Sequence, residues 1–224
     1  NAMPLARFLT TLSTGRLQVD VTPYGQVYQS LAADGDEPAG WGGIVWTLAE
    51  RVIPSFARAL HLEHVEPSLC LTEVDAFADT LAGFAARHQH SFMASWTIPP
   101  AFRGYGMLDW RPRLGLMHLL AQMNLRLADR IADMPNTYLL DAGRWLASTP
   151  KALAPRMWYA AKVPYSSQVF EQAARDLMVA IGGISGTSRR LIVLDLDDTL
   201  WSGTVGESGW EGIDQKLVGR CAMA

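Results

Sequence analysis

Short apolar segments alternate with helical patterns through most of this chain, and this alternation constrains the fold more than any other feature. The segments expected to form strands are Leu17–Val21, "GIVWTL" (43–48), "SFMASWTIPP" (91–100) and "TYLLDA" (137–142). The strongest helical patterns are Val74–Ala85, Arg113–Ala132 and Ser167–Ile181. Strands separated by helices form a parallel sheet with helices on both faces. The sequence therefore predicts an α/β fold of three layers.

Local signals refine this plan. The apolar spacing from Leu5 to Leu12 predicts an opening helix that ends before Gly15. Thr72 and Asp75 resemble a capping box at the start of the first long helix. Asn124 is the one polar residue on the apolar side of its helix. We expect it to be a buried amide bonded to a neighbouring loop, with a ligand contact as the alternative.

The glycine-rich stretch "GGISGTSRR" (182–190) marks a domain boundary. We expect a first domain over residues 4–182, a linker over 183–190 and a second α/β unit over 191–224. About 30 residues are too few to bury a core of their own. The second unit is therefore expected to be the truncated start of a longer domain.

Composition excludes several classes of function. A net charge of −3 with no basic stripe argues against nucleic-acid binding. No segment approaches the roughly 20 uninterrupted apolar residues of a membrane helix. The chain has two cysteines and no pattern of a signal peptide, which is typical of a cytoplasmic protein. Small molecules and proteins are the expected partners.

The segment "LIVLDLDDTLW" (191–201) carries the chemistry. Four apolar residues predict a buried strand, and ligands of open α/β sheets bind beyond the carboxyl ends of strands. There Asp195 can act as a nucleophile toward phosphorus, and Asp197 can protonate the leaving oxygen and then activate water. Thr199 can donate a hydrogen bond to Asp195 or to the phosphoryl group. Because phosphate and carboxylate repel each other, the chemistry needs a hard cation, and Mg²⁺ with oxygen ligands is the expected cofactor.

"LIVLDLDDTLW" resembles the first motif of the haloacid dehalogenase superfamily of aspartyl-phosphate enzymes, and "WSGTVGESGWEGI" (201–213) is similar to its FkbH-like branch. Upstream, "TPYGQVYQSL", "FMASWTIPP" and "NTYLLDAGRWLA" resemble the amino-terminal domain of that branch, which is similar to the SGNH hydrolase fold. The resemblance covers about residues 5–213.

This resemblance implies an enzyme of polyketide biosynthesis. It would dephosphorylate a phosphorylated three-carbon acyl precursor and load the acyl group onto an acyl carrier protein. Asp195 would be the nucleophile and Asp197 the acid/base, with Mg²⁺ bound to both. The branch usually has Asn at the position of Asp198. Its later Ser or Thr, its Lys and its final acidic cluster have no counterpart between Trp201 and Ala224, so we expect this chain alone to be inactive.

Two other functions remain open. The first domain could be a non-catalytic docking domain for a carrier protein, with Arg103, Arg111, Arg113 and Arg144 as its basic residues. It could also be an SGNH-type esterase using Ser13 and Asp141. Arg144 stands where such an esterase requires His, which disfavours that reading. Neither Cys70 nor Cys221 is expected to be a nucleophile.

Overall fold

The computed structural model describes residues 2–23, 25–32, 41–98, 102, 104–161, 163–187, 201–202 and 214–215. The chain divides into two compact units, Asn1–Met178 and Val179–Ala224. Its elements are α1 (Met3–Leu12), α2 (Val27–Ala32), β1 (Gly42–Val45), η1 (Ala49–Arg51), α3 (Pro54–Leu60), α4 (Pro67–Ala86), β2 (His90–Ala94), η2 (Gly106–Leu108), α5 (Leu116–Ala132), β3 (Thr137–Leu140), α6 (Ala142–Ala147), α7 (Pro155–Ala161), α8 (Ser167–Ile184), β4 (Trp201–Ser202) and β5 (Asp214–Gln215).

A parallel sheet in the order β1–β2–β3 forms the centre of the first unit. The register aligns Val45 with Met93 and Met93 with Leu139, which places these side chains on one face. Phe92 and Tyr138 are likewise aligned and stack on the other face, with ring centroids 5.6 Å apart. The predicted α/β class with a parallel sheet is confirmed.

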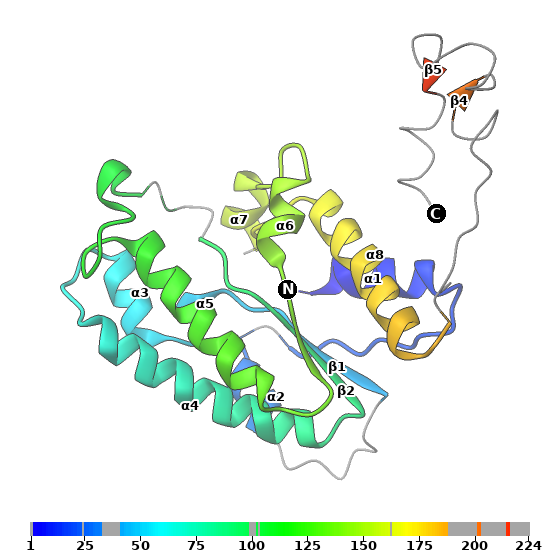
Figure 1. Cartoon of the computed structure of the whole chain (residues 1–224), viewed down its shortest axis with the longest axis horizontal. Helices are drawn as coiled ribbons and strands as arrows, with labels where there is room; N and C mark the ends of the chain where they lie inside the picture. The colour runs from blue at the N-terminus through cyan, green and yellow to red at the C-terminus, as the bar shows by residue number, and fades with distance from the viewer. Residues whose placement is uncertain are drawn as a thin grey trace. The chain divides into compact units, whose positions relative to one another are not determined.

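Helices cover both faces of this sheet (Figure 1). Val45 and Met93 belong to a core built with residues of α3, α4 and α5, such as Phe56, Phe77 and Met123. Figure 1 shows α1 and α8 on the opposite side of the strands. The strands are consequently apolar on both faces, which is typical of parallel sheets.

One predicted strand and three predicted helix boundaries are wrong. The segment Leu17–Val21 is extended, with alternating half-buried and exposed side chains, but it pairs with no described strand. The long helix α4 begins at Pro67, five residues before the expected capping box, because proline suits the first helical position. The next long helix begins at Leu116 instead of Arg113, whose φ of 66° is not helical. Finally, α8 continues through the predicted glycine stop to Ile184.

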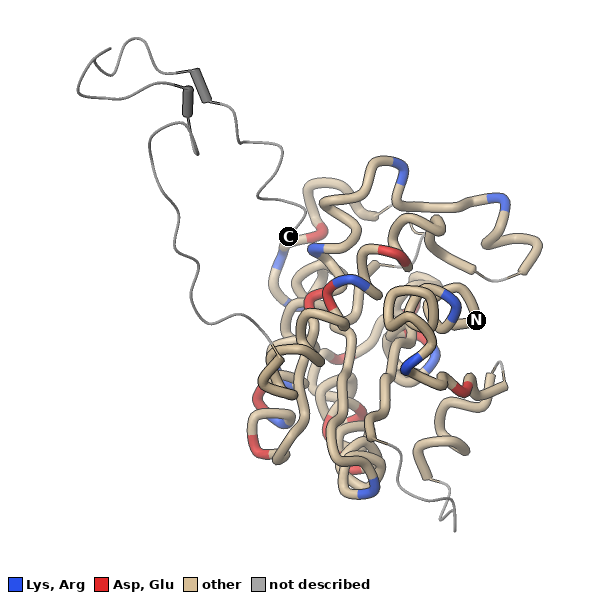
Figure 2. The backbone as a smooth tube through the Cα atoms, turned by 90° about the vertical axis from the view of Figure 1, so that its right-hand side faces the viewer, with Lys and Arg blue, Asp and Glu red and all other residues tan. Residues whose placement is uncertain are grey.

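Charged side chains join α4 to α5. Arg126 binds Asp75 through two hydrogen bonds of 2.8 and 2.9 Å, and Arg130 binds Asp79 one turn further along. Arg126 and Arg130 of α5 thus lie against its neighbour α4. The Arg126 guanidinium holds the pKa of the Asp75 carboxyl below its usual value. Figure 2 shows basic and acidic positions spread along the described chain.

The short helix α3 is also anchored to α4. Glu73 accepts hydrogen bonds from the Ser55 backbone N–H (2.8 Å) and from the Ser55 hydroxyl (2.6 Å). These bonds satisfy polar groups in the first turn of α3, where helices lack internal partners. Ser55 is buried, so the carboxylate fixes the start of α3 inside the protein.

Asn124 makes the backbone contact predicted for it, although its side chain is half-buried and not buried. Its Oδ1 accepts a hydrogen bond from the Trp96 backbone N–H, and its Nδ2 donates one to the Trp96 carbonyl oxygen, both at 2.8 Å. The amide thereby satisfies both backbone groups of a residue that has just left β2 and pairs with no strand there. It connects α5 to the carboxyl end of the central strand.

We predict that Asn124→Ala lowers the free energy of unfolding by about 2–4 kcal/mol, because the N–H and C=O of buried Trp96 lose their partners. Chemical denaturation of the purified chain measures this change. Asp129→Ala, at an exposed position of the same helix, is the control and should change stability by less than about 0.5 kcal/mol. Equal effects of the two substitutions would show that the two hydrogen bonds between Asn124 and the Trp96 backbone do not stabilise the fold.

Candidate functional site

The residues with the clearest predicted chemistry, Asp195, Asp197 and Thr199, lie outside the described residues, as does the strand predicted before them. Their roles therefore remain predictions. In the second unit the structure describes the antiparallel pair of β4 and β5, in which Trp201 is aligned with Gln215. Among the described residues, no group of three His, Cys, Asp or Glu side chains is arranged to hold a metal ion.

The carboxyl edge of the sheet in the first unit is the next place to seek a site. Two polar residues there serve the start of α6. Asp141 Oδ1 accepts a hydrogen bond from the Arg144 N–H (3.2 Å), and Ser95 Oγ accepts one from the Ala142 N–H (3.0 Å). Both contacts satisfy backbone donors at the beginning of a helix. Asp141 therefore has a structural role as a helix cap.

An aromatic cluster closes the same edge. The Trp46 ring, directly after β1, stacks on Tyr165 with a centroid distance of 5.5 Å and also contacts Trp145 and Phe170. The Tyr165 hydroxyl shares a 2.6 Å hydrogen bond with the Thr97 hydroxyl, which follows β2. Burial raises the pKa of Tyr165 to about 12, so the phenol is neutral at physiological pH.

Glu50 adds a carboxyl group to this region. It lies in η1, shortly after β1, and its Oε2 atom is buried without a hydrogen-bond partner among the described residues. Burial raises the pKa of Glu50, because desolvation disfavours the charged form. Its negative charge also contributes to the raised pKa of Tyr165. This half-buried acid has no sequence signal beyond a single glutamate among mostly apolar residues.

We predict that Glu50→Gln stabilises the chain at neutral pH. With a raised pKa in the folded state, the folded protein binds more protons than the unfolded chain, and stability falls as pH rises above about 4.5, the ordinary value for Glu. The substitution removes this loss. In thermal unfolding from pH 4 to 8, the Glu50→Gln variant should melt near the wild-type temperature at pH 4. At pH 7.5 its melting temperature should be higher than that of wild type.

The control for Glu50 is Asp20→Asn, at an exposed carboxylate that forms no ion pair among the described residues. We expect this substitution to leave the pH profile unchanged, because the exposed carboxylate is hydrated in both states. A Glu50→Gln variant that is less stable than wild type at pH 7.5 would show that the ionised carboxylate has a partner.

The esterase residues are not available for nucleophilic chemistry. Ser13 is buried, donates through Oγ to the Thr10 carbonyl (3.0 Å) and accepts from the Leu17 N–H (3.1 Å), so it caps the end of α1. Asp141 caps α6, as described above. Cys70 is fully buried, and desolvation raises the pKa of its thiol to about 11, so it remains protonated. Cys221 lies outside the described residues.

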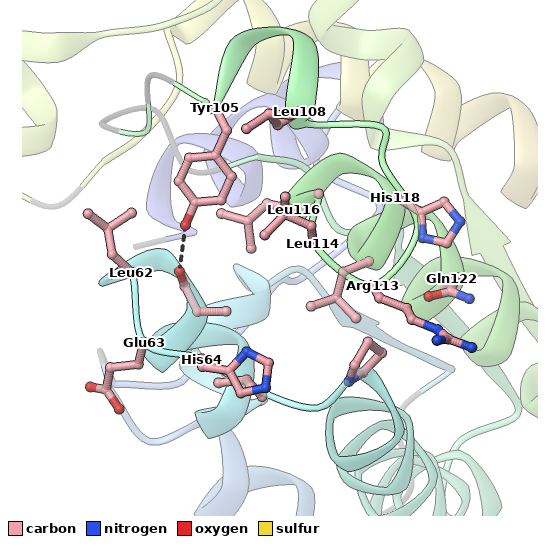
Figure 3. Close-up of a pocket in the computed structure, with 15 residues that line it drawn as sticks. Leu62, Glu63, His64, Tyr105, Leu108, Arg113, Leu114, Leu116, His118 and Gln122 are labelled. Carbon is pink, nitrogen blue, oxygen red and sulfur yellow. Dashed lines mark hydrogen bonds between the residues drawn. The ribbon is translucent and has the colours of Figure 1, made fainter.

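A groove of about 530 Å³ lies between α3 and the start of α5 (Figure 3). We call it the α3–α5 groove; its lining residues are Ala59, Leu62, Glu63, His64, Val65, Pro67, Tyr105, Leu108, Arg113, Leu114, Gly115, Leu116, His118, Leu119 and Gln122. Figure 3 shows Arg113, His118 and Gln122 on one side of it. Leu62, Glu63 and His64 lie on the opposite side. The floor between them is apolar.

Sequence reasoning did not find this groove. It named Arg111 and Arg113 as basic residues but did not connect them with the segment 61–67, which is distant in sequence. Arg113 lines the groove, Arg144 lies in α6 instead, and Arg103 lies outside the described residues. The available signal was the run "GYGMLDWRPRLG", which places large apolar residues among turn-forming ones.

The fold places the chain among α/β proteins with a parallel sheet covered by helices on both faces. A solved structure with this fold is the N-terminal part of the protein BF1531 from Bacteroides fragilis, which contains a phosphatase domain complexed with Mg. The likeness has a TM-score of 0.73 at 17% identity and covers 95% of this chain but 57% of that one. Our chain thus spans little more than half the length of its structural neighbour.

No family model and no curated protein sequence matches the chain. At 17% identity, the likeness to the Bacteroides structure establishes a common fold. Among the described helices, none combines the length and the apolar character that crossing a membrane requires.

Proposed function

We propose that this chain is the amino-terminal part of a Mg²⁺-dependent phosphatase of the haloacid dehalogenase type. The observation that carries the proposal is the segment "LIVLDLDDTLW", in which an apolar run is followed by carboxylates and a threonine at the spacing of that chemistry. The likeness in fold to a structure that contains a phosphatase domain complexed with Mg supports it.

In this proposal Asp195 attacks the phosphorus atom of a phosphate ester and forms an aspartyl phosphate. Asp197 gives its proton to the leaving alcohol oxygen and then takes a proton from the water that hydrolyses the aspartyl phosphate. Thr199 donates a hydrogen bond to Asp195 or to the transferring group. Carboxylate oxygens are ligands that Mg²⁺ prefers, so Asp195 and Asp197 fit the cation. When bound, the cation offsets the repulsion between phosphate and carboxylate.

The resemblance to FkbH-like proteins extends the proposal to substrate and partner. The substrate would be a phosphorylated three-carbon acyl compound, and the dephosphorylated acyl group would be loaded onto an acyl carrier protein for polyketide biosynthesis. What supports this finer proposal is the set of similar segments on both sides of the linker, from "TPYGQVYQSL" to "WSGTVGESGWEGI". We also propose a cytoplasmic location, supported by the low cysteine content.

The proposed activity needs groups beyond the first motif. A Ser or Thr, a Lys that neutralises the phosphoryl charge and a late acidic cluster have no counterpart in residues 202–224. The structural neighbour is also longer, since the likeness covers 57% of it. We therefore propose that turnover belongs to a longer gene product and that residues 1–224 alone release little phosphate.

The test is phosphate release from a phosphorylated three-carbon acid with Mg²⁺, using the gene product extended beyond Ala224. We predict that Asp195→Asn lowers the rate by at least about a hundredfold, because the nucleophile is lost. Asp198→Asn introduces the residue that the resembled family usually has, and it should retain activity. Equal release by wild type and by the Asp195 variant would refute the proposal.

A second candidate is docking of a carrier protein by the first unit. It is favoured by Arg111 and Arg113, which pair with no carboxylate among the described residues and stand at the α3–α5 groove or in the turn that forms its wall. The two candidates are compatible, because the second concerns binding and the first concerns chemistry.

A further inference from the structure

Large apolar side chains stand exposed around the α3–α5 groove. Leu62 and Leu114 line it with 74% and 56% of their surface exposed. Trp110 and Met107, 63% and 94% exposed, belong to the turn 104–115 that forms one wall. Large apolar side chains exposed around a groove mark sites of protein interaction, because their hydration is unfavourable.

Two acidic residues beside this surface, Glu63 and Asp109, have hydrogen-bond partners. Glu63 forms an ion pair with Arg58 at 2.7 Å. Asp109 Oδ1 accepts a hydrogen bond from the Tyr105 N–H at 2.8 Å. Arg111 and Arg113 have no such carboxylate partner in the described part of the chain. The groove therefore presents two arginines that form no ion pair among the described residues, next to apolar surface.

The wall of the groove is held in place before any partner arrives. The Tyr105 hydroxyl donates to the Ala59 carbonyl (3.2 Å), which ties the turn 104–115 to α3 (Figure 3). The His118 N–H donates to the Asp109 carbonyl (3.0 Å), which ties the same turn to α5. At Gly115, an added Cβ would overlap the backbone of Asp109, so the close approach requires glycine. A wall fixed in this way lowers the entropic cost of binding.

We propose that the α3–α5 groove binds an amphipathic helix of a partner protein, with leucine-like side chains on one face and carboxylates beside them. The apolar floor and the exposed Leu62 and Leu114 would cover the apolar face. Arg111 and Arg113 would meet the carboxylates, and this charge complementarity selects an acidic partner. The partner's identity as a carrier protein rests on the proposed function, whereas the chemistry of the groove does not.

A helix suits this surface better than a small molecule. Small-molecule pockets bury most of their ligand's surface. Here Trp110 and Met107 project from the wall with most of their area exposed, and a compact ligand in the groove would leave them in water. A helix about 10 Å wide fills the groove and also covers these flanking side chains.

The test uses two labelled 16-residue peptides that differ in charge alone. Both carry Leu at positions i, i+4, i+7 and i+11 on an alanine-rich helix, and the flanking positions are Glu in one peptide and Lys in the other. Fluorescence anisotropy with the whole chain measures their affinities. We expect the Glu peptide to bind at least about tenfold more tightly than the Lys peptide, with the difference shrinking as salt rises.

Variants locate the binding. The double variant Arg111→Glu/Arg113→Glu should lose about tenfold in affinity for the Glu peptide and gain affinity for the Lys peptide, a reversal that misfolding cannot produce. Leu114→Ser should weaken both peptides. The matched controls, Arg144→Glu in α6 and the exposed Leu125→Ser in α5, should bind as wild type does.

Three results would overturn the proposal: no binding of the Glu peptide at millimolar concentration, equal binding of both peptides, or unchanged binding by the Arg111/Arg113 variant. These readouts are independent of phosphate release. Failure of the peptide-binding test would not contradict the proposed phosphatase chemistry of Asp195. Failure of the phosphatase assay would likewise not contradict helix binding by the groove.

Discussion

Burial of the strand β2 on both faces is the constraint on which the first unit depends. Ser91, Phe92, Met93 and Ala94 are each at most 2% exposed, so both sides of this strand need apolar cover. The helices α3, α4 and α5 supply it on one side, and Figure 1 shows α1 and α8 on the other. The strand ends where Trp96 leaves the sheet, and the Asn124 side chain satisfies the backbone at that point. The end of the central strand is thus determined both by packing and by the hydrogen bonds of Asn124.

Much of this arrangement follows from the sequence. The apolar segments after Trp41, after Gln89 and after Asn136 do form the sheet, because strand residues buried on both faces must be apolar. Asn124 could be assigned because a lone amide on an apolar helix face needs a partner nearby. The error at the start of α4 has a local cause, because Pro67 begins the helix before the expected cap. Thr72, expected to cap a helix, lies inside α4, and its hydroxyl bonds to the Ser68 carbonyl.

Some candidate sites can be recognised from the sequence, and others only from the structure. The aspartates of "LIVLDLDDTLW" are readable from the sequence because their chemistry depends on a short, contiguous motif. The α3–α5 groove is not, since its walls come from segments about 40 residues apart in the chain, represented by Leu62 and Tyr105. The half-buried Glu50 could not be identified from the sequence either, because its raised pKa comes from desolvation that only the folded chain creates.

The bond network at Ser55 has a consequence for recognition. The helix α3 has seven residues, too few to be stable as an isolated helix in water. Its first turn is held by Glu73, and its last turn lies at Ala59, where the groove begins. The bonds to Glu73 hold one end of α3, and Ala59 at the groove lies near the other end, about 10 Å away. These bonds therefore help to fix the position of one edge of the groove. A change at Glu73, which does not line the groove, would alter partner selection by shifting one edge of the opening.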